Sequence, residues 1–428
     1  MGQTLAEKVL ARCSGMPGAR AGDAVAAAPD FVLAYELKGT TDVIERDLVT
    51  YGAGRVHRPE RVVMFIDHRV PPKTPEQEAF HEETRAWSRR EGFRLFEREG
   101  IGHQVAPEKG YAIPGAFAVH ADGHVSQMGA FGVLAMGLRG SVFEAWVGDA
   151  VTLSVPHTTR IDLHGALPPG VMGRDVLHTL IHRYGSEFAA FDVIEFGGEG
   201  AAGLSVEDRQ AICGQTMFTG ALSSVFEPTA ALCASLPPAL PGYGHIQREM
   251  PDANATYRQR LDLDLGSVEP LLAAPPDPGN IVAVAQVAGL AVQAAYLGSC
   301  ASGRLEDLEV AAAILRGRQI APGVSMHIVP SSQQVMRAAA DNGTLGQLLA
   351  AGAFVSSPSC DFCSGNIATM APGQRAVSTG TLNVPGRMGA LDAEIYLGSP
   401  AFVAASALEG RIVDPRAYAD LLGGARHA

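Results

Sequence analysis

Apolar and polar residues follow two different periods along the chain, and these periods predict alternating strands and helices. Short β-branched runs predict buried strands at 61–68, 115–124 and 191–196. Charged and apolar residues at helical spacing predict helices at 78–93 and 204–222, the second capped by a serine with an acid three residues later. Each of these strands is followed by polar residues, which places functional groups where strands end.

The same alternation continues through the last third of the chain. Strands are predicted at 281–287, 294–300, 324–330 and 351–360, with helices at 305–317 and 332–352. This spacing predicts α/β layers around largely parallel sheets, with an active site beyond the carboxyl ends of the strands. Residues 236–280, which are rich in proline, glycine and acids, are predicted to form a surface connection.

Composition narrows the class of protein. The 428 residues are 47% hydrophobic and 18% charged, as in a packed enzyme rather than a disordered chain. The net charge of −12 argues against a general binder of nucleic acid or anionic membranes. Thr4 and Glu7 predict a capping box that opens a short helix. With no secretory leader or spanning segment recognised, the expected location is the cytoplasm.

A literal G-x-G-x-x-G occurs at 198–203, between a predicted strand and a predicted helix. A dinucleotide site also requires an acid at the end of a second strand about 20 residues later, and none follows. Glu199 would place negative charge where a pyrophosphate should bind. We therefore interpret the motif as a glycine-rich turn.

The only C-x-x-C pair is Cys360 and Cys363, and six cysteines are too few for a disulfide scaffold in a chain this long. A redox pair is one interpretation. A zinc site is a second, with Cys300 and His327 completing four ligands. A third is an iron–sulfur cluster held by Cys300, Cys360 and Cys363, which would leave one iron open to a substrate oxygen. The residues alone leave these alternatives open.

Three histidines lie at strand ends or in loops, two of them with an acid nearby. These histidines occur in Asp67–His68, in His103–Gln104 and in the Asp122-Gly123-His124 segment. A carboxylate beside a histidine fixes its tautomer and raises its basicity, as acid–base catalysis requires. Together the three groups indicate a catalytic site.

In order and spacing, these motifs resemble the large subunits of the 3-isopropylmalate dehydratases, within the aconitase superfamily. The resemblance runs from residue 4 to residue 415. The most specific segments are IDH (66–68), HQVAPEKG (103–110), GAFG (129–132), LGSCASGRLEDL (297–308), SCDFCSG (359–365) and NVPGRMGALDAEIYLGSPAFVAASALEG (383–410).

The resemblance implies an α/β fold of three α/β/α domains around a 4Fe-4S cluster, without the swivelling domain. That domain would belong to a separate small subunit, so the expected assembly is a heterodimer acting on a small hydroxy acid. The expected domains are 1–157, with the DH, HQ and DGH motifs; 158–275; and 276–428, with the cluster cysteines.

The resemblance also implies a role for each site residue. Cys300, Cys360 and Cys363 match the iron ligands, and Asp67 with His68 would protonate the leaving hydroxyl. His103 and Asp122 would form a second polar pair, with His124 beside them. The residues expected to contact substrate are Arg387, Lys38, Gln104 and Asn383.

Departures from the family pattern lie at the substrate site. Gly123 replaces a serine, Gly214 an amide, Phe218 a carboxylate and Leu382 a carboxylate-binding arginine. Losing such an arginine while keeping its carboxylate would leave a buried charge unpaired, which costs several kcal/mol. We therefore predict a cluster-dependent hydro-lyase or isomerase of a 2- or 3-hydroxy acid other than the standard dicarboxylate. The alternatives are a conventional 3-isopropylmalate dehydratase of leucine biosynthesis and a non-catalytic iron sensor or scaffold.

Overall fold

The computed structural model describes residues 2–36 and 41–422. Its first sheet is covered by helical segments on both faces. The strand order is β4-β3-β2-β5-β6, all parallel. Side chains alternate between the faces. One face packs on α1, α2, α3 and α5, and the other on α4 and the 3-10 segment η3. The bounds are α1 Leu5–Ser14, β2 Phe31–Tyr35, α2 Thr41–Thr50, β3 Val62–Ile66, α3 Pro75–Glu91, β4 Arg94–Glu97, α4 Gly102–Ala106, β5 Phe117–His120, η3 Gly123–Phe131, β6 Leu134–Gly137 and α5 Val142–Val147.

The second sheet is also parallel, in the order β10-β9-β8-β11. A two-stranded antiparallel pair, β1 and β7, lies in the chain before it. The bounds are β1 Ala24–Ala27, β7 Val151–Ser154, β8 Thr158–His164, α6 Gly173–Tyr184, β9 Val193–Gly197, α7 Glu199–Gly203, α8 Val206–Cys213, the 3-10 segment η5 Thr216–Thr219, β10 Ser223–Phe226, α9 Ala230–Ser235 and β11 Gln259–Asp264.

The third sheet has the order β13-β12-β18-β17-β14-β15-β16 and is parallel except at β12, which runs antiparallel to both its neighbours. Several parallel sheets joined through helices confirm the predicted α/β class. The bounds are β12 Leu271–Ala273, β13 Ile281–Ala283, α10 Val284–Val287, β14 Ala294–Leu297, α11 Leu305–Leu315, β15 Ser325–Ile328, α12 Gln333–Asp341, α13 Thr344–Ala350, β16 Phe354–Val355, the 3-10 segment η7 Phe362–Ser364, β17 Arg375–Ser378, β18 Glu394–Leu397 and α14 Pro400–Glu409.

Five local predictions are corrected. The helix predicted over 332–352 is two helices, α12 and α13, separated at Asn342 and Gly343, and the strand predicted over 351–360 is reduced to the two residues of β16. The helix predicted over 204–222 ends at Cys213, and a separate 3-10 turn follows before β10. The strand predicted over 281–287 becomes helix α10 after Ala283. The surface connection predicted over 236–280 contains β11 and β12, because apolar residues such as Leu263 and Leu272 are buried in the sheets. Proline and glycine around these short strands masked their apolar positions.

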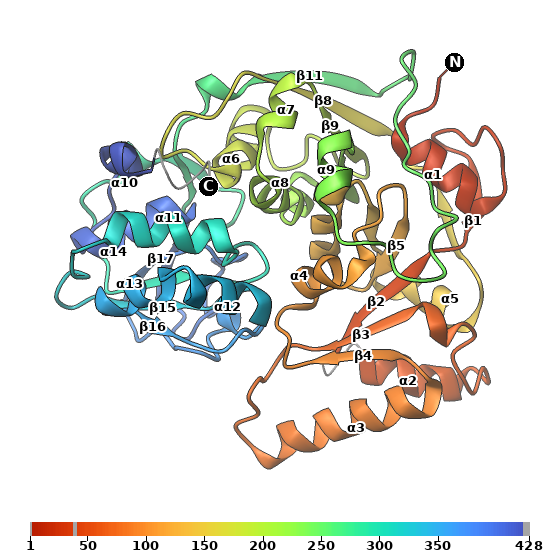
Figure 1. Cartoon of the computed structure of the whole chain (residues 1–428), viewed down its shortest axis with the longest axis horizontal. Helices are drawn as coiled ribbons and strands as arrows, with labels where there is room; N and C mark the ends of the chain where they lie inside the picture. Colours follow the sequence, from red (N-terminus) through yellow and green to blue (C-terminus); the bar gives the residue numbers. More distant parts are fainter. Residues whose placement is uncertain (1, 37–40, 423–428) are drawn as a thin grey trace.

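The first and third sheets meet at the carboxyl ends of their strands. Figure 1 shows the orange elements of the first sheet beside the blue elements of the third, with the yellow-green second sheet across the top. Backbone hydrogen bonds join them, from Ile101 N to Ser331 O (2.9 Å) and from Gln333 N to Glu99 O (2.7 Å). The domain boundaries at 157 and 275 stay a prediction; β12, which precedes residue 275, pairs with the third sheet.

Two smaller features complete the fold. The predicted capping box is present, with the Thr4 side chain accepting from Glu7 N and Glu7 accepting from Thr4 N. In the G-x-G-x-x-G segment, Gly198 has φ +87° and packs on the backbone of Leu163, where a Cβ would overlap the carbonyl oxygen. This close approach gives the glycine a packing role. No helix within residues 2–36 and 41–422 combines the length and apolar character needed to cross a bilayer.

Candidate functional site

The turn after β3 carries a buried ion pair. Asp67 is 2% exposed, and its Oδ1 lies 2.8 Å from Nδ1 of His68. The two atoms are poorly aligned for a hydrogen bond, so the contact is mainly electrostatic. Burial would lower the pKa of His68, but the Asp67 carboxylate outweighs it and raises that pKa to about 10. His68 is therefore held protonated at neutral pH, as a proton donor requires.

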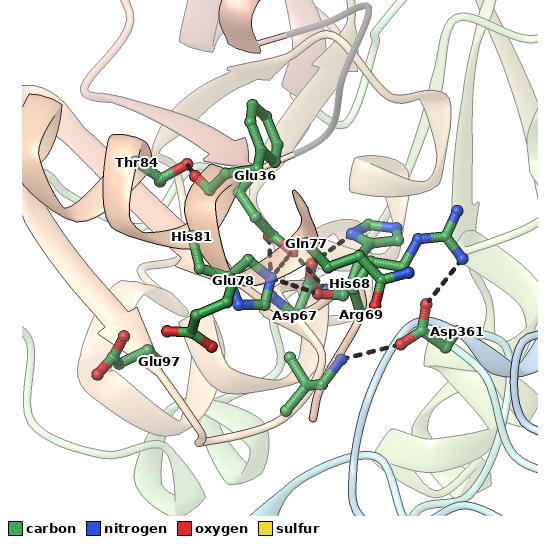
Figure 2. A network of polar contacts seen from close by, with 12 residues as sticks. Glu36, Asp67, His68, Arg69, Gln77, Glu78, His81, Thr84, Glu97 and Asp361 are labelled. Atoms are coloured by element: carbon green, nitrogen blue, oxygen red, sulfur yellow. Dashed lines mark hydrogen bonds and ion pairs between the residues drawn. The ribbon is translucent and has the colours of Figure 1, made fainter. Parts of the chain in front are cut away.

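Glu36, which the sequence reasoning missed, supports this turn from the end of β2. Its carboxylate accepts hydrogen bonds from the backbone N–H groups of Asp67 (2.9 Å) and His68 (2.8 Å). Burial raises its pKa to about 7. Figure 2 shows Glu36 pointing at the turn, with His81 beside it. The signal was present, because Glu36 directly follows a strand, just as Asp67 does.

A second acid–histidine group lies at the end of β5. Asp122 Oδ1 is 2.9 Å from His124 Nδ1 and also accepts from the His124 backbone N–H. Its Oδ2 lies 3.7 Å from His103 Nε2, so Asp122 joins the two histidines. His120, also missed, accepts from Asp122 N through Nδ1 (2.8 Å), and burial lowers its pKa to about 3. This neutral imidazole orients Asp122 without adding charge.

The three predicted cysteines come together from two segments of the third sheet. Cys300 follows β14, after Ser299 at φ +76°, while Cys360 and Cys363 flank the start of η7. The Cys360 thiol donates a hydrogen bond to the Cys300 sulfur, and this bond lowers the pKa of the Cys300 thiol to about 6. The backbone N–H of Cys360 donates to the carbonyl of Asp67 (2.6 Å). The cysteines therefore adjoin the His68 turn, and all six cysteines are free thiols.

These cysteines fit a cluster better than a single ion. A single ion needs several ligand atoms close to one another. Among the described residues, the one group of three or more acid, histidine or cysteine ligand atoms that lie within 4.8 Å of one another consists of Glu36, Asp67 and His68, and the three cysteines do not form such a group. In that group Asp67 Oδ1 already pairs electrostatically with His68 Nδ1, and the Glu36 oxygens accept backbone N–H groups. His327, proposed above as a zinc ligand, instead stacks between the rings of Tyr296 (5.4 Å) and Phe354 (5.3 Å).

Hydrogen-bond donors surround the cysteines. Arg387 Nη2 lies 3.6 Å from Cys363 Sγ, and Thr381 Oγ1 lies 3.7 Å from it. In the described part of the chain, His124 Nε2 and Ser359 Oγ are buried without a hydrogen-bond partner. Charges on Cys300 and Cys363 act on His124 and help Asp122 raise its pKa, against burial, to about 10. Donors of this kind suit thiolates that carry an anionic cluster.

The predicted substrate contacts are placed unevenly. Gln104 is occupied, donating to Glu108 Oε1 (2.9 Å) and accepting from Gln210 Nε2 (3.1 Å). Asn383 donates to Ala273 O (3.2 Å), while its buried Oδ1 has no partner among the described residues. Arg387 has a buried Nε in the same condition. Lys38 lies outside the described residues.

Of the positions that depart from the family pattern, Phe218 lies beside His124 and Gly123 faces Met217. A Cβ on Gly123 would lie 3.3 Å from both Sδ and Cε of Met217, so a serine there would press on Met217. The Phe218 ring lies 6.5 Å from the His124 ring in an edge arrangement. A Cβ on Gly214 would lie 3.0 Å from the carbonyl oxygen of Gln210. At position 218 an aromatic ring thus lies near His124 where the family pattern has a carboxylate.

Sequence comparison matches nearly the whole chain to known proteins. A family model described as aconitase family (aconitate hydratase) matches residues 22–290 and 284–410. The 3-isopropylmalate dehydratase large subunit 1 of Methanopyrus kandleri is 37% identical, covering 98% of this chain and 100% of its own length. The homoaconitase large subunit of Thermus thermophilus is 36% identical, covering 97% of this chain and 98% of its own. Aconitase X of Thermococcus kodakaraensis is a remote structural neighbour, with a TM-score of 0.48, 14% identity and 88% coverage of both chains.

Proposed function

Since this chain belongs to the aconitase family and is a hydro-lyase of the aconitase type, we propose that it is the catalytic large subunit of a dehydratase or isomerase acting on a 2- or 3-hydroxy carboxylic acid. The observation that carries the proposal is the meeting of the Asp67–His68 ion pair with three cysteines from two other segments. Removal of a hydroxyl group needs a proton donor, and the protonated His68 lies beside three thiols that suit an iron–sulfur cluster.

Cys300, Cys360 and Cys363 would hold a 4Fe-4S cluster. When bound, such a cluster with three protein ligands supplies an open iron that acts as a Lewis acid toward a hydroxyl or carboxylate oxygen. The low pKa of Cys300 and the donors Arg387 and Thr381 support this assignment, because metal ligands must be thiolates.

The chain's own residues would handle the leaving group. His68, kept protonated by Asp67, would donate its proton to the departing hydroxyl oxygen, so that water leaves. Asp122 would hold the histidines at 103 and 124, which orients polar groups toward the same space. The relatives are named as large subunits, and we propose that a small-subunit partner closes the site and contributes the base that removes the carbon-bound proton.

We propose that the substrate carries an apolar group where a standard substrate carries its second carboxylate. Leu382 is half-buried, the Phe218 ring lies 6.5 Å from the His124 ring, and Met217 faces Gly123. A second carboxylate facing these side chains would lose hydration without gaining a cation, which costs several kcal/mol.

The test uses the full chain coexpressed with a small-subunit homologue and reconstituted anaerobically with iron and sulfide. We expect broad visible absorbance and dehydration of a hydroxy acid bearing one carboxylate and one alkyl or aryl group. Protein that holds no iron, or that turns over no hydroxy acid, contradicts the proposal. Equal or better turnover of 3-isopropylmalate, with growth of a leucine auxotroph, would establish the conventional dehydratase instead.

A reversal variant sharpens the specificity test. Leu382→Arg restores a cation for a second carboxylate, and we expect the kcat/KM ratio of 3-isopropylmalate to the one-carboxylate acid to rise at least about 10-fold, since a buried pair changes binding by a few kcal/mol. Leu382→Met is the matched control, because it changes shape without adding charge. An unchanged ratio in Leu382→Arg would show that position 382 does not contact the substrate.

A further inference from the structure

We propose that Glu36 and His81 are positioning residues that fix the backbone of His68 from both sides, and so aim its imidazole at the leaving hydroxyl. The inference rests on the proposed function, in which His68 donates the proton. Neither residue belongs to the motifs that identified the site. They come from different elements, the end of β2 and the middle of α3.

Glu36 holds the N–H side of the turn. Its Oε2 accepts from Asp67 N (2.9 Å) and its Oε1 from His68 N (2.8 Å), so each carboxylate oxygen takes one backbone donor. Glu36 is 2% exposed, and burying a carboxylate is unfavourable unless its bonds are strong. Charge-assisted bonds to two successive N–H groups fix the turn more firmly than neutral bonds would.

His81 holds the carbonyl side of the same residue. Its Nε2 lies 3.0 Å from His68 O and 3.7 Å from Glu36 Oε1, and the ring is 2% exposed. His68 is therefore gripped at its N–H by Glu36, at its C=O by His81 and at its ring by Asp67 (Figure 2). Three contacts from three elements leave the imidazole little freedom to rotate.

The local backbone explains why such support is needed. The next residue, Arg69, has φ +56°, a conformation unfavourable for a residue with a long side chain. Strained turns persist only where surrounding contacts over-determine them. Without Glu36 and His81 the turn would relax toward ordinary φ values and move the imidazole. A displacement of about 1 Å at a reacting group costs on the order of 100-fold in rate.

The experiment compares four variants of the reconstituted two-subunit complex. Glu36→Gln keeps the size of the side chain but presents one N–H₂ group to a backbone N–H. His81→Leu removes the donor to His68 O, whereas His81→Gln keeps an amide nitrogen near the position of Nε2. Glu195→Gln is the matched control, because Glu195 in β9 of the second sheet is a 0% exposed carboxylate that accepts from the backbone N–H of Leu5 (2.9 Å) and pairs with Arg160 (2.8 Å).

We expect Glu36→Gln and His81→Leu to lower kcat by about 10- to 100-fold, the usual effect of losing a group that orients a catalytic residue, with KM within about twofold. His81→Gln should recover kcat to within about fivefold of wild type, and Glu195→Gln should leave it unchanged. Iron content and visible absorbance should match wild type throughout. Unchanged kcat in Glu36→Gln, a change in KM alone, no recovery in His81→Gln, or an equal loss in Glu195→Gln would overturn the proposal.

Amide hydrogen exchange separates this inference from the proposed function. Peptides covering residues 67–70 should exchange at least about 10-fold faster in Glu36→Gln and His81→Leu, and at the wild-type rate in Glu195→Gln. A wild-type complex that turns over no hydroxy acid contradicts the proposed function. The exchange measurement then still tests whether Glu36 and His81 hold the turn at residues 67–70. Unchanged exchange in Glu36→Gln and His81→Leu would overturn the inference.

Discussion

Asp67→Asn should produce a rate defect that depends steeply on pH. In the wild-type protein, burial lowers the pKa of His68, and the Asp67 carboxylate 2.8 Å away more than reverses this and raises it to about 10. In the wild-type protein Asp67 Oδ2 accepts a hydrogen bond from the backbone N–H of Gly102 (2.7 Å). The amide oxygen of an asparagine can accept the same hydrogen bond, so the turn keeps that contact. The substitution therefore removes the charge and preserves most of the packing.

The magnitude follows from the protonated fraction of His68. At pH 8, a histidine with a pKa of about 10 is ~99% protonated, whereas one at the ordinary value of about 6.5 is ~3% protonated. If kcat follows the acid form, Asp67→Asn should be about 30-fold slower at pH 8 and only about 1.3-fold slower at pH 6. Unopposed burial would lower the variant's pKa further, so these ratios are lower bounds.

The assay is kcat from pH 6 to pH 10 for wild type and Asp67→Asn, each reconstituted with its small subunit and checked for equal iron content. Asp192→Asn is the control, because Asp192 is 1% exposed and bonds Thr159 Oγ1 (2.8 Å) in the second sheet. A defect of equal size at pH 6 and pH 8 would refute the reasoning, since it would show that Asp67 acts through something other than the protonation of His68.

Three further outcomes are expected. Cys363→Ala should lose the visible absorbance and most of the iron after reconstitution, whereas Cys233→Ala, a half-buried thiol outside the site, should keep both; equal iron in the two would contradict the ligand assignment. Gly129→Ala should lower the free energy of unfolding by about 2 kcal/mol or more in urea titration, because its Cβ would overlap the Ser224 carbonyl oxygen, while Gly140→Ala meets open space and should change it by less than about 0.5 kcal/mol. Because folding raises the pKa of His68, its contribution to the free energy of unfolding should be fully present below pH 6.5 and be lost as the pH rises through about 10. Over this pH range the free energy of unfolding of the wild-type protein should therefore fall more than that of His68→Gln.

The apolar patterning predicted most of the elements around the site, because the strands that carry it are buried on both faces. The strands before Asp67 and Asp122 were placed within a few residues of β3 and β5. The helix predicted through 222 failed beyond Cys213, because Gly214 and the apolar run after it continue the pattern into a 3-10 turn that only packing against η3 defines.

The candidate site could be predicted from the sequence where an acid and a histidine directly follow a strand. Asp67, His68, Asp122 and His124 were found this way, and the structure brings them together with the cysteines. Glu36 also follows a strand directly but was missed, because no histidine stands beside it. His81 gave no signal, since one histidine on a charged helix resembles any other until the helix is placed on its sheet.

The sequence by itself determined the α/β class, the family and the identities of the groups that can do chemistry, because these depend on local periodicity and on ordered motifs. Only the tertiary structure decided which groups meet. Cys360 N binds the carbonyl of Asp67 across 293 positions, and Glu36 accepts from residues more than 30 positions away. Such contacts arise from how two sheets are placed against each other, and the free energy that fixes that placement is spread over whole cores rather than written in any short segment.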